Sequence, residues 1–196
     1  IKKSYDNFTI DVTASIGIAI FPSHGDTFTS LLSSADKAMY QVKNTGKNNF
    51  KIYHDDIDQK RLRELQLISD MRIGLTTGQF HVHYQAKQCL KTDELTGCEA
   101  LIRWQHPTLG NIPPLEFISL AESSGLIIPL GKLVLEQSCL FIKQWQTHSG
   151  KPLVVSVNVS SLQLKNPQFK EEVLQVIKDA GISGRNIELE LTESLL

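Results

Sequence analysis

The stretch Leu95-Thr96-Gly97-Cys98-Glu99-Ala100-Leu101-Ile102-Arg103-Trp104 decides the fold that this sequence predicts. In a β-strand alternate side chains face opposite sides, so the apolar residues share one face: Cys98, Ala100, Ile102 and Trp104. The other face carries a carboxylate and a guanidinium, Glu99 and Arg103, on either side of Leu101. Charged groups are rarely buried unless they are paired or bind a metal, and catalytic groups collect at the C-terminal ends of parallel barrel strands. Two interpretations follow: a structural Glu99–Arg103 ion pair, or a functional site.

Alternating strands and helices surround this stretch. Strands are predicted over residues 80–86, 153–160 and 186–193. Helices are predicted over residues 114–122, 130–146 and 167–180, each followed by a glycine that ends it. The run 153–160 is almost continuously β-branched, as in a strand buried on both faces of a parallel sheet. The pattern predicts βαβ units in an α/β barrel or an open sheet.

A smaller β-α-β segment precedes this part of the chain. We expect a strand over residues 9–20, a helix from Thr29 or Ser30 to Asn44, and a short strand over residues 49–53. A charged, sparsely apolar helix over residues 58–78 then joins two domains. We therefore predict a first domain over residues 1–57, a linker helix over 58–78 and a second domain over 79–196.

Composition limits the function classes. The chain has 196 residues and is 41% hydrophobic, enough to bury a core in one or two domains. A net charge of −1, from 20 basic and 21 acidic residues, gives no reason to expect nucleic acid or an anionic membrane as main partner. The cysteines Cys89, Cys98 and Cys139 are odd in number and lack C-x-x-C spacing. This pattern favours packing roles in a reducing cytosol over disulfides or a zinc site.

The ends of the chain carry no targeting signal. No apolar run approaches the roughly 20 residues that span a bilayer, and the N-terminus has no basic region followed by an apolar one. We therefore expect a cytoplasmic location for this segment. Because it begins at Ile1 without methionine, we also expect it to be part of a longer protein, which an N-terminal region could tether to a membrane.

Three successive predicted strands end in oxygen-bearing side chains: Glu99, Asn158 and Glu190. Mg²⁺ and Mn²⁺ prefer oxygen ligands such as two carboxylates and an amide oxygen. For any one of these three residues taken alone, the simpler interpretation is an unrelated polar residue at the end of a strand. His81 and His83 alternate on another strand, and we interpret them as solvated rather than as metal ligands.

The first part of the chain resembles a GGDEF (diguanylate cyclase) domain. The resemblance rests on Ser15-Ile16-Gly17-Ile18-Ala19, Ala35-Asp36-Lys37-Ala38-Met39-Tyr40 and Val42-Lys43-Asn44-Thr45-Gly46-Lys47-Asn48. It implies that Lys43 and Lys47 touch nucleotide phosphates, and residues four apart share a helix face. A solvated lysine pair is the favoured interpretation. The family's Gly-Gly-Asp/Glu-Glu-Phe loop does not occur, so no cyclase activity is expected from these residues.

The second part resembles the EAL family of cyclic-di-GMP phosphodiesterases over nearly all of residues 62–196. The matching motifs are Tyr84-Gln85, Gly97-Cys98-Glu99-Ala100-Leu101-Ile102-Arg103-Trp104, Pro114-Leu115-Glu116-Phe117-Ile118, Ala121-Glu122-Ser123-Ser124-Gly125-Leu126-Ile127, Ser156-Val157-Asn158-Val159-Ser160 and Glu190-Leu191-Thr192-Glu193-Ser194. The resemblance implies a (β/α)₈ barrel whose first strand is antiparallel, here with only its first half present. It also implies metal-dependent hydrolysis of cyclic di-GMP to linear pGpG.

Carried over residue by residue, the resemblance implies roles for six side chains. Glu99, Asn158 and Glu190 would be ligands of Mg²⁺ or Mn²⁺, with Glu99 also counted as catalytic. Glu193, also counted as catalytic, would hold an active-site loop. Arg103 would contact a phosphate, and Gln85 would contact the substrate from the first strand. Ala86 departs from the family, which usually has proline after Tyr-Gln.

The residues end at Leu196, before the family's Asp-Asp pair and its lysine on later strands. A half barrel exposes unpaired strand edges, so we expect this fragment to be inactive and the intact protein to be the enzyme. The alternative is a non-catalytic cyclic-di-GMP receptor. An unrelated Mg²⁺-dependent barrel enzyme is supported only by analogy of fold. A homodimer through the EAL part is a further expectation.

Overall fold

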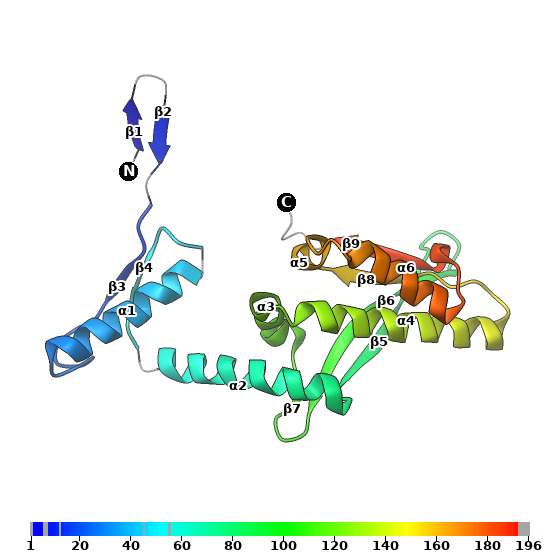
Figure 1. Ribbon diagram of the computed structural model, residues 1–196, viewed down its shortest axis with the longest axis horizontal. Helices are drawn as coiled ribbons and strands as arrows, with labels where there is room; N and C mark the ends of the chain where they lie inside the picture. The colour runs from blue at the N-terminus through cyan, green and yellow to red at the C-terminus, as the bar shows by residue number, and fades with distance from the viewer. Residues whose placement is uncertain (1, 6–7, 12, 45, 55, 192–196) are drawn as a thin grey trace. The chain divides into compact units, whose positions relative to one another are not determined.

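The computed structural model describes residues 2–5, 8–11, 13–44, 46–54 and 56–191. The chain divides into two compact units, residues 1–64 and 65–196, which contain the elements drawn in Figure 1. None of the helices described is both long and apolar enough to cross a membrane.

The first unit is a small β-α-β arrangement. Its elements are β1 (Lys2–Tyr5), β2 (Phe8–Asp11), β3 (Ile16–Ile18), α1 (Phe28–Asn44), β4 (Phe50–Ile52) and the first turns of α2 (Asp56–Thr77). The strand predicted over residues 9–20 is wrong as a single element. β2 pairs with β1 in one antiparallel sheet, whereas β3 pairs in parallel with β4 in another. Local alternation cannot show that the two halves of the run have different partners.

Helix α1 begins at Phe28, one or two residues before the predicted caps, because Thr27 caps it. The Ser30 backbone N–H donates to Thr27 Oγ1 at 3.1 Å, and the Thr27 N–H donates to Ser30 Oγ at 3.0 Å. The helix ends at Asn44, as predicted. Lys47 lies beyond this end with a φ of 60°, so it does not share a helix face with Lys43, in agreement with the predicted end of the helix before Gly46.

The second unit is built on one mixed sheet. Its elements after α2 are β5 (Phe80–Gln88), β6 (Leu95–His106), β7 (Gly110–Ile112), α3 (Pro114–Ser124), α4 (Ile127–Ser149), β8 (Val155–Val159), α5 (Ser161–Leu164), α6 (Phe169–Ala180), the 3₁₀ turn η1 (Gly184–Asn186) and β9 (Ile187–Leu191). The strand order is β5-β6-β8-β9. β5 is antiparallel to β6, while β6, β8 and β9 are parallel to one another. The predicted α/β fold with an antiparallel first strand is confirmed.

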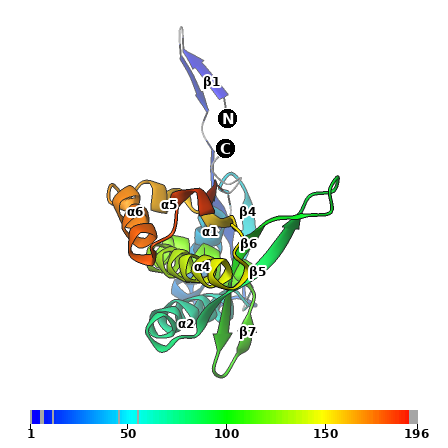
Figure 2. The same ribbon diagram turned by 90° about the vertical axis from the view of Figure 1, so that its right-hand side faces the viewer.

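Helices α3 and α4 extend beyond the predicted bounds, whereas α6 begins two residues later than predicted. α4 runs along the sheet beside α6 (Figure 1) and begins at Ile127, since Pro129 in its first turn needs no backbone N–H donor there. The long β5–β6 hairpin projects past these helices (Figure 2). Residues that the sequence presents as a turn form β7, which pairs back onto the end of β6.

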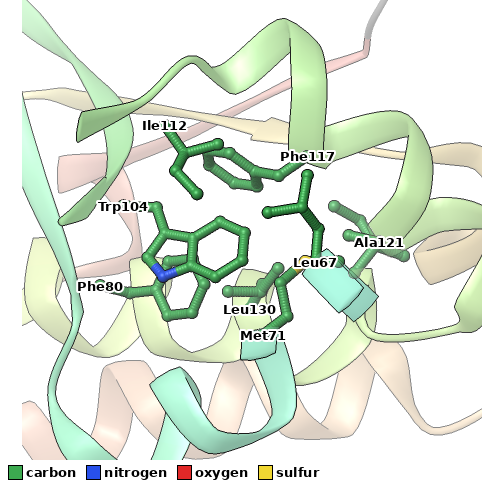
Figure 3. Close-up of a cluster of buried hydrophobic side chains, with 9 residues drawn as sticks. Leu67, Met71, Phe80, Trp104, Ile112, Phe117, Ala121 and Leu130 are labelled. Carbon is green, nitrogen blue, oxygen red and sulfur yellow. The ribbon is translucent and has the colours of Figure 1, made fainter. Parts of the chain in front are cut away.

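An aromatic core anchors the end of β6 (Figure 3). Trp104 is fully buried and stacks on Phe80, with ring centroids 5.1 Å apart, while the Phe117 ring meets it edge-on at 5.6 Å. The Trp104 Nε1–H donates to Gln79 Oε1 at 3.0 Å, so its polar atom is satisfied. Further buried side chains complete the cluster: Leu67, Met71, Ile112, Ala121, Ile127 and Leu130.

We predict that Trp104→Ala destabilises the second unit by about 3 to 5 kcal/mol, because it leaves a large cavity among aromatic rings. Urea unfolding of the protein measures this loss. Leu90→Ala is the matched control, since Leu90 is fully exposed and should stay within about 0.5 kcal/mol of wild type. A Trp104→Ala loss as small as that of the control would contradict the packing described.

Tyr84 gives the core a pH-dependent contribution. Its ring stacks on Phe141 of α4 at 3.8 Å, and burial raises the pKa of its hydroxyl from 10.0 to about 12. The folded protein therefore favours the neutral phenol. The resulting stabilisation is complete below pH 10, the unfolded pKa, and is lost as the pH rises toward 12.

We accordingly expect wild type to lose more stability than Tyr84→Phe when the pH is raised from about 8 to about 11, because the variant has no phenol to ionise. Urea midpoints at the two pH values measure the difference. Equal losses in the two proteins would show that Tyr84 is not the group responsible.

Candidate functional site

One face of the sheet in the second unit is polar because the strand register aligns alternate residues. Glu99 lies opposite Gln85 on β5 and beside Ser156 on β8, and Asn158 lies beside Glu190 on β9. Side chains two residues apart along each strand share the same face. This polar face carries Gln85, Lys87, Glu99, Arg103, Ser156, Asn158, Glu188 and Glu190. The opposite face packs into the core through Cys98, Ala100, Val155 and Val157.

The predicted ligands Glu99 and Asn158 are in direct contact. Asn158 Nδ2 donates to Glu99 Oε1 at 2.7 Å, and the register places Glu190 next to Asn158. Glu99 and Glu190 are half-buried, whereas Asn158 is exposed. The three residues that the sequence singled out therefore lie on one face of three adjacent strands.

The predicted Glu99–Arg103 ion pair does not form among the residues described. Four residues of extended strand separate their Cα atoms by about 13 Å. Arg103 Nη1 instead donates to the carbonyl of Ile102 at 2.9 Å. The structural ion-pair interpretation of this strand is therefore wrong.

A lysine that the sequence analysis missed joins this face. Lys87 Nζ donates to Glu190 Oε1 at 2.5 Å and to Ser156 Oγ at 2.6 Å, and Ser156 Oγ donates to Glu188 Oε2 at 3.3 Å. The hydrogen bond from Lys87 lowers the pKa of Glu190, and the hydrogen bond to Glu190 raises the pKa of Lys87. Both groups therefore favour their charged forms.

The signal for the missed residues was present in the sequence. Lys87, Ser156 and Glu188 each lie two residues from a side chain that the analysis did select, namely Gln85, Asn158 and Glu190. Period-two alternation places each of them on the same face as that neighbour.

A cavity opens where β6 and β8 separate. The two strands pair only as far as Ala100 and Val157, and β6 then continues into its hairpin with β7. The space between them, of about 390 Å³, is closed by α3 and α4. Its lining includes Arg103, Glu122 and Asn158 as polar groups and Leu101, Ile118 and Leu130 as apolar ones. Arg103 offers a cation to an anionic group of a ligand, and the apolar side chains offer a surface to its apolar or aromatic part.

The chain after Asn158 is fixed by a buried capping box. The Gln163 backbone N–H donates to Ser160 Oγ at 3.4 Å, and the Ser160 N–H donates to Gln163 Oε1 at 3.1 Å. Gly131 of α4 makes room for this arrangement, since a Cβ there would lie 2.0 Å from Gln163 Nε2. The box therefore holds the end of β8, where Asn158 lies.

The remaining residues considered from the sequence fall in three places. Lys43 and Lys47 belong to the first unit. Glu193 lies outside the described residues. His81 and His83 precede Gln85 on β5 at period two, so they share the polar face, and their rings are 5.3 Å apart. Cys98 and Cys139 are buried in the core, in agreement with the predicted packing roles, and Cys89 is half-buried.

The donor set on the polar face fits a hard divalent cation. In the part of the chain that the structure describes, no three His, Cys, Asp or Glu side chains form a cluster that could hold a metal. The candidate set instead combines two carboxylates with the amide of Asn158, which already touches Glu99. Carboxylate and amide oxygens suit Mg²⁺ or Mn²⁺, whereas the absence of a thiolate or imidazole donor from this set disfavours zinc.

Comparison with known families agrees with both resemblances. The model described as EAL domain matches residues 68–196, and the model described as diguanylate cyclase, GGDEF domain matches residues 2–49. The order of the two domains inferred from the sequence is confirmed.

Curated relatives are similar over nearly the whole of this chain. The chain is 38% identical over 184 residues to the cyclic di-GMP phosphodiesterase PdeR of Escherichia coli K12. It is 34% identical over 185 residues to the bifunctional diguanylate cyclase/cyclic di-GMP phosphodiesterase MucR of Pseudomonas aeruginosa. Each alignment covers 94% of this chain but only 28% and 27% of the two relatives. The chain thus spans about a quarter of the length of these proteins.

Solved structures share the fold. The MucR phosphodiesterase in complex with c-di-GMP matches with a TM-score of 0.63 and 34% identity, over 65% of this chain and 52% of that chain. The EAL enzyme Bd1971 in its cGMP-bound form matches with a TM-score of 0.64 at 24% identity, over 88% of this chain and 45% of that chain. The second likeness supports the fold alone.

We predict that Gln163→Ala destabilises the protein by about 1 kcal/mol or more, because it removes one half of the buried capping box. Urea unfolding measures the change. Gln168→Ala is the matched control, since Gln168 is exposed and its side chain does not cap α6. The positioning role assigned to the capping box would be refuted by a Gln163→Ala variant as stable as this control.

Proposed function

The chain belongs to the EAL domain family and carries part of a GGDEF domain before it, and we propose that the whole protein hydrolyses cyclic di-GMP to linear pGpG with a divalent cation. The observation that supports this proposal is the shared face of Glu99, Asn158 and Glu190 on three adjacent strands, with Glu99 and Asn158 in contact. Relatives that are named cyclic di-GMP phosphodiesterases support the same substrate.

The proposed mechanism assigns each described residue a separate task. Glu99, Asn158 and Glu190 would hold Mg²⁺ or Mn²⁺ through their side-chain oxygens. When bound, the cation supplies an activated water and stabilises charge on the phosphoryl oxygen. Arg103, which lines the neighbouring cavity, would donate two parallel hydrogen bonds to a non-bridging phosphate oxygen. Gln85 lies opposite Glu99 and would contact the substrate from β5.

We extend the proposal to the domain boundaries and to residues outside the polar face. Glu193 would hold an active-site loop, as the resemblance implies. The first domain would comprise residues 1–57, the linker helix residues 58–78, and the EAL part residues 79–196. Lys43 and Lys47 belong to the first unit, and a solvated lysine pair stays the favoured interpretation over a nucleotide-phosphate contact there.

One observation favours a second candidate function, a non-catalytic cyclic-di-GMP receptor. The Lys87 ammonium already occupies Oε1 of Glu190, one of the oxygens available to a cation. A receptor would need the cavity and Arg103 but no activated water. We place this alternative second, because a receptor has no chemical need for Glu99, Asn158 and Glu190 together.

Incubation of the full-length protein with cyclic di-GMP and Mn²⁺ should yield pGpG, measured by chromatography. Glu99→Gln should lower kcat/KM by at least about 100-fold, because loss of a ligand costs more than loss of the groups that orient one. Glu94→Gln is the matched control, since Glu94 is an exposed carboxylate near the end of the β5–β6 hairpin.

The same assay separates the two candidate functions. Cyclic di-GMP that binds but is not cleaved would support the receptor instead. A Glu99→Gln variant with full turnover would rule out the ligand role of Glu99.

A further inference from the structure

Lys87 reaches across the sheet to its partners. It lies on β5, whereas Ser156 and Glu190, which it contacts at 2.6 and 2.5 Å, lie on β8 and β9 beyond β6. Its register partner on β6 is Gly97, which has no side chain to block the path. The β5–β6 register shifts directly after Lys87, and such irregularities re-aim side chains. The lack of a side chain at Gly97 therefore lets Lys87 extend along the polar face to Ser156 and Glu190.

Three carboxylates attract this ammonium, one of them by direct contact. Glu190 accepts its hydrogen bond, and Glu188 and Glu99 lie close enough to act on its charge. Glu188 is tied to the same group through Ser156. Two of these carboxylates, Glu99 and Glu190, are the proposed cation ligands. Lys87 thus places one positive charge inside the donor set proposed for a divalent cation.

We infer that Lys87 competes with the divalent cation for Glu190 and thereby weakens cation binding at the proposed site. The inference rests on the proposed function, because it takes Glu99, Asn158 and Glu190 as ligands. Two mechanisms act in the same direction. A cation that takes Glu190 Oε1 must displace the ammonium, and a cation that takes the other oxygen lies close to the positive charge of the ammonium.

Solvent limits the effect of Lys87 on cation affinity. The side chains of Lys87 and Glu190 keep 38% and 32% of their surface exposed, so water and salt screen the repulsion. We therefore expect the competition to change cation affinity by about tenfold. The site would then be half-occupied at a higher concentration of Mg²⁺ or Mn²⁺ than a site without the lysine.

The test is a Mn²⁺ titration of the full-length protein without nucleotide at constant ionic strength, in which electron paramagnetic resonance reports free Mn²⁺. Lys87→Met should bind Mn²⁺ about tenfold more tightly than wild type, because it removes the charge and keeps most of the side-chain length. Lys87→Arg keeps the charge and should stay near wild type. Lys91→Met, at an exposed position in the β5–β6 hairpin, is the matched control and should not change the affinity.

The outcomes separate this inference from the proposed function. A merely structural role for Lys87 predicts weaker Mn²⁺ binding in Lys87→Met, so unchanged or weaker binding overturns the inference. The cleavage assay tests the proposed function separately. If wild type cleaves cyclic di-GMP but Lys87→Met binds Mn²⁺ no more tightly than wild type, the inference fails and the proposed function stands. If Glu99→Gln binds Mn²⁺ as tightly as wild type, the proposed ligand set is wrong and the inference fails with it.

Discussion

The candidate site depends on the parallel register of β6, β8 and β9. Because alternate residues of a strand face the same way, that register alone brings Glu99, Asn158 and Glu190 to one face and sends Cys98 and Val155 into the core. A shift of one residue in any of the three strands would reverse both faces of that strand. Burial of the apolar face therefore fixes the position of the polar one.

The core on either side of this sheet keeps the register in place. Trp104 ends the decisive stretch inside an aromatic cluster, and the Ser160–Gln163 capping box fixes the chain after β8. Neither feature touches the proposed cation ligands directly. Both lie beyond the last paired residues of β6 and β8, Ala100 and Val157, in the region where the cavity beside Arg103 and Asn158 opens.

Much of this arrangement could be predicted because its causes are local. The two faces of β6 follow from alternation, and Gly125, Gly150 and Gly181 end α3, α4 and α6 in the left-handed conformation that glycine favours. The features that could not be predicted depend on distant partners. β7 forms only because β6 extends far enough to pair with it.

Lys87 illustrates the same limit at the site. Its period-two position on β5 was readable, but its contact with Glu190 requires that β9 lie within reach across Gly97. Likewise, the strand predicted over residues 9–20 divides because its halves join different sheets. Sequence pattern thus predicts which way a side chain faces, while tertiary structure decides what it meets.

The central claim is that oxygens from three neighbouring strands share one divalent cation. Anomalous X-ray diffraction from Mn²⁺-soaked crystals of the full-length protein tests it most directly, since the manganese signal locates the ion without assumptions about its ligands. The account predicts a peak within direct coordination distance of side-chain oxygens of Glu99, Asn158 and Glu190. A peak that none or only one of these residues reaches would contradict it.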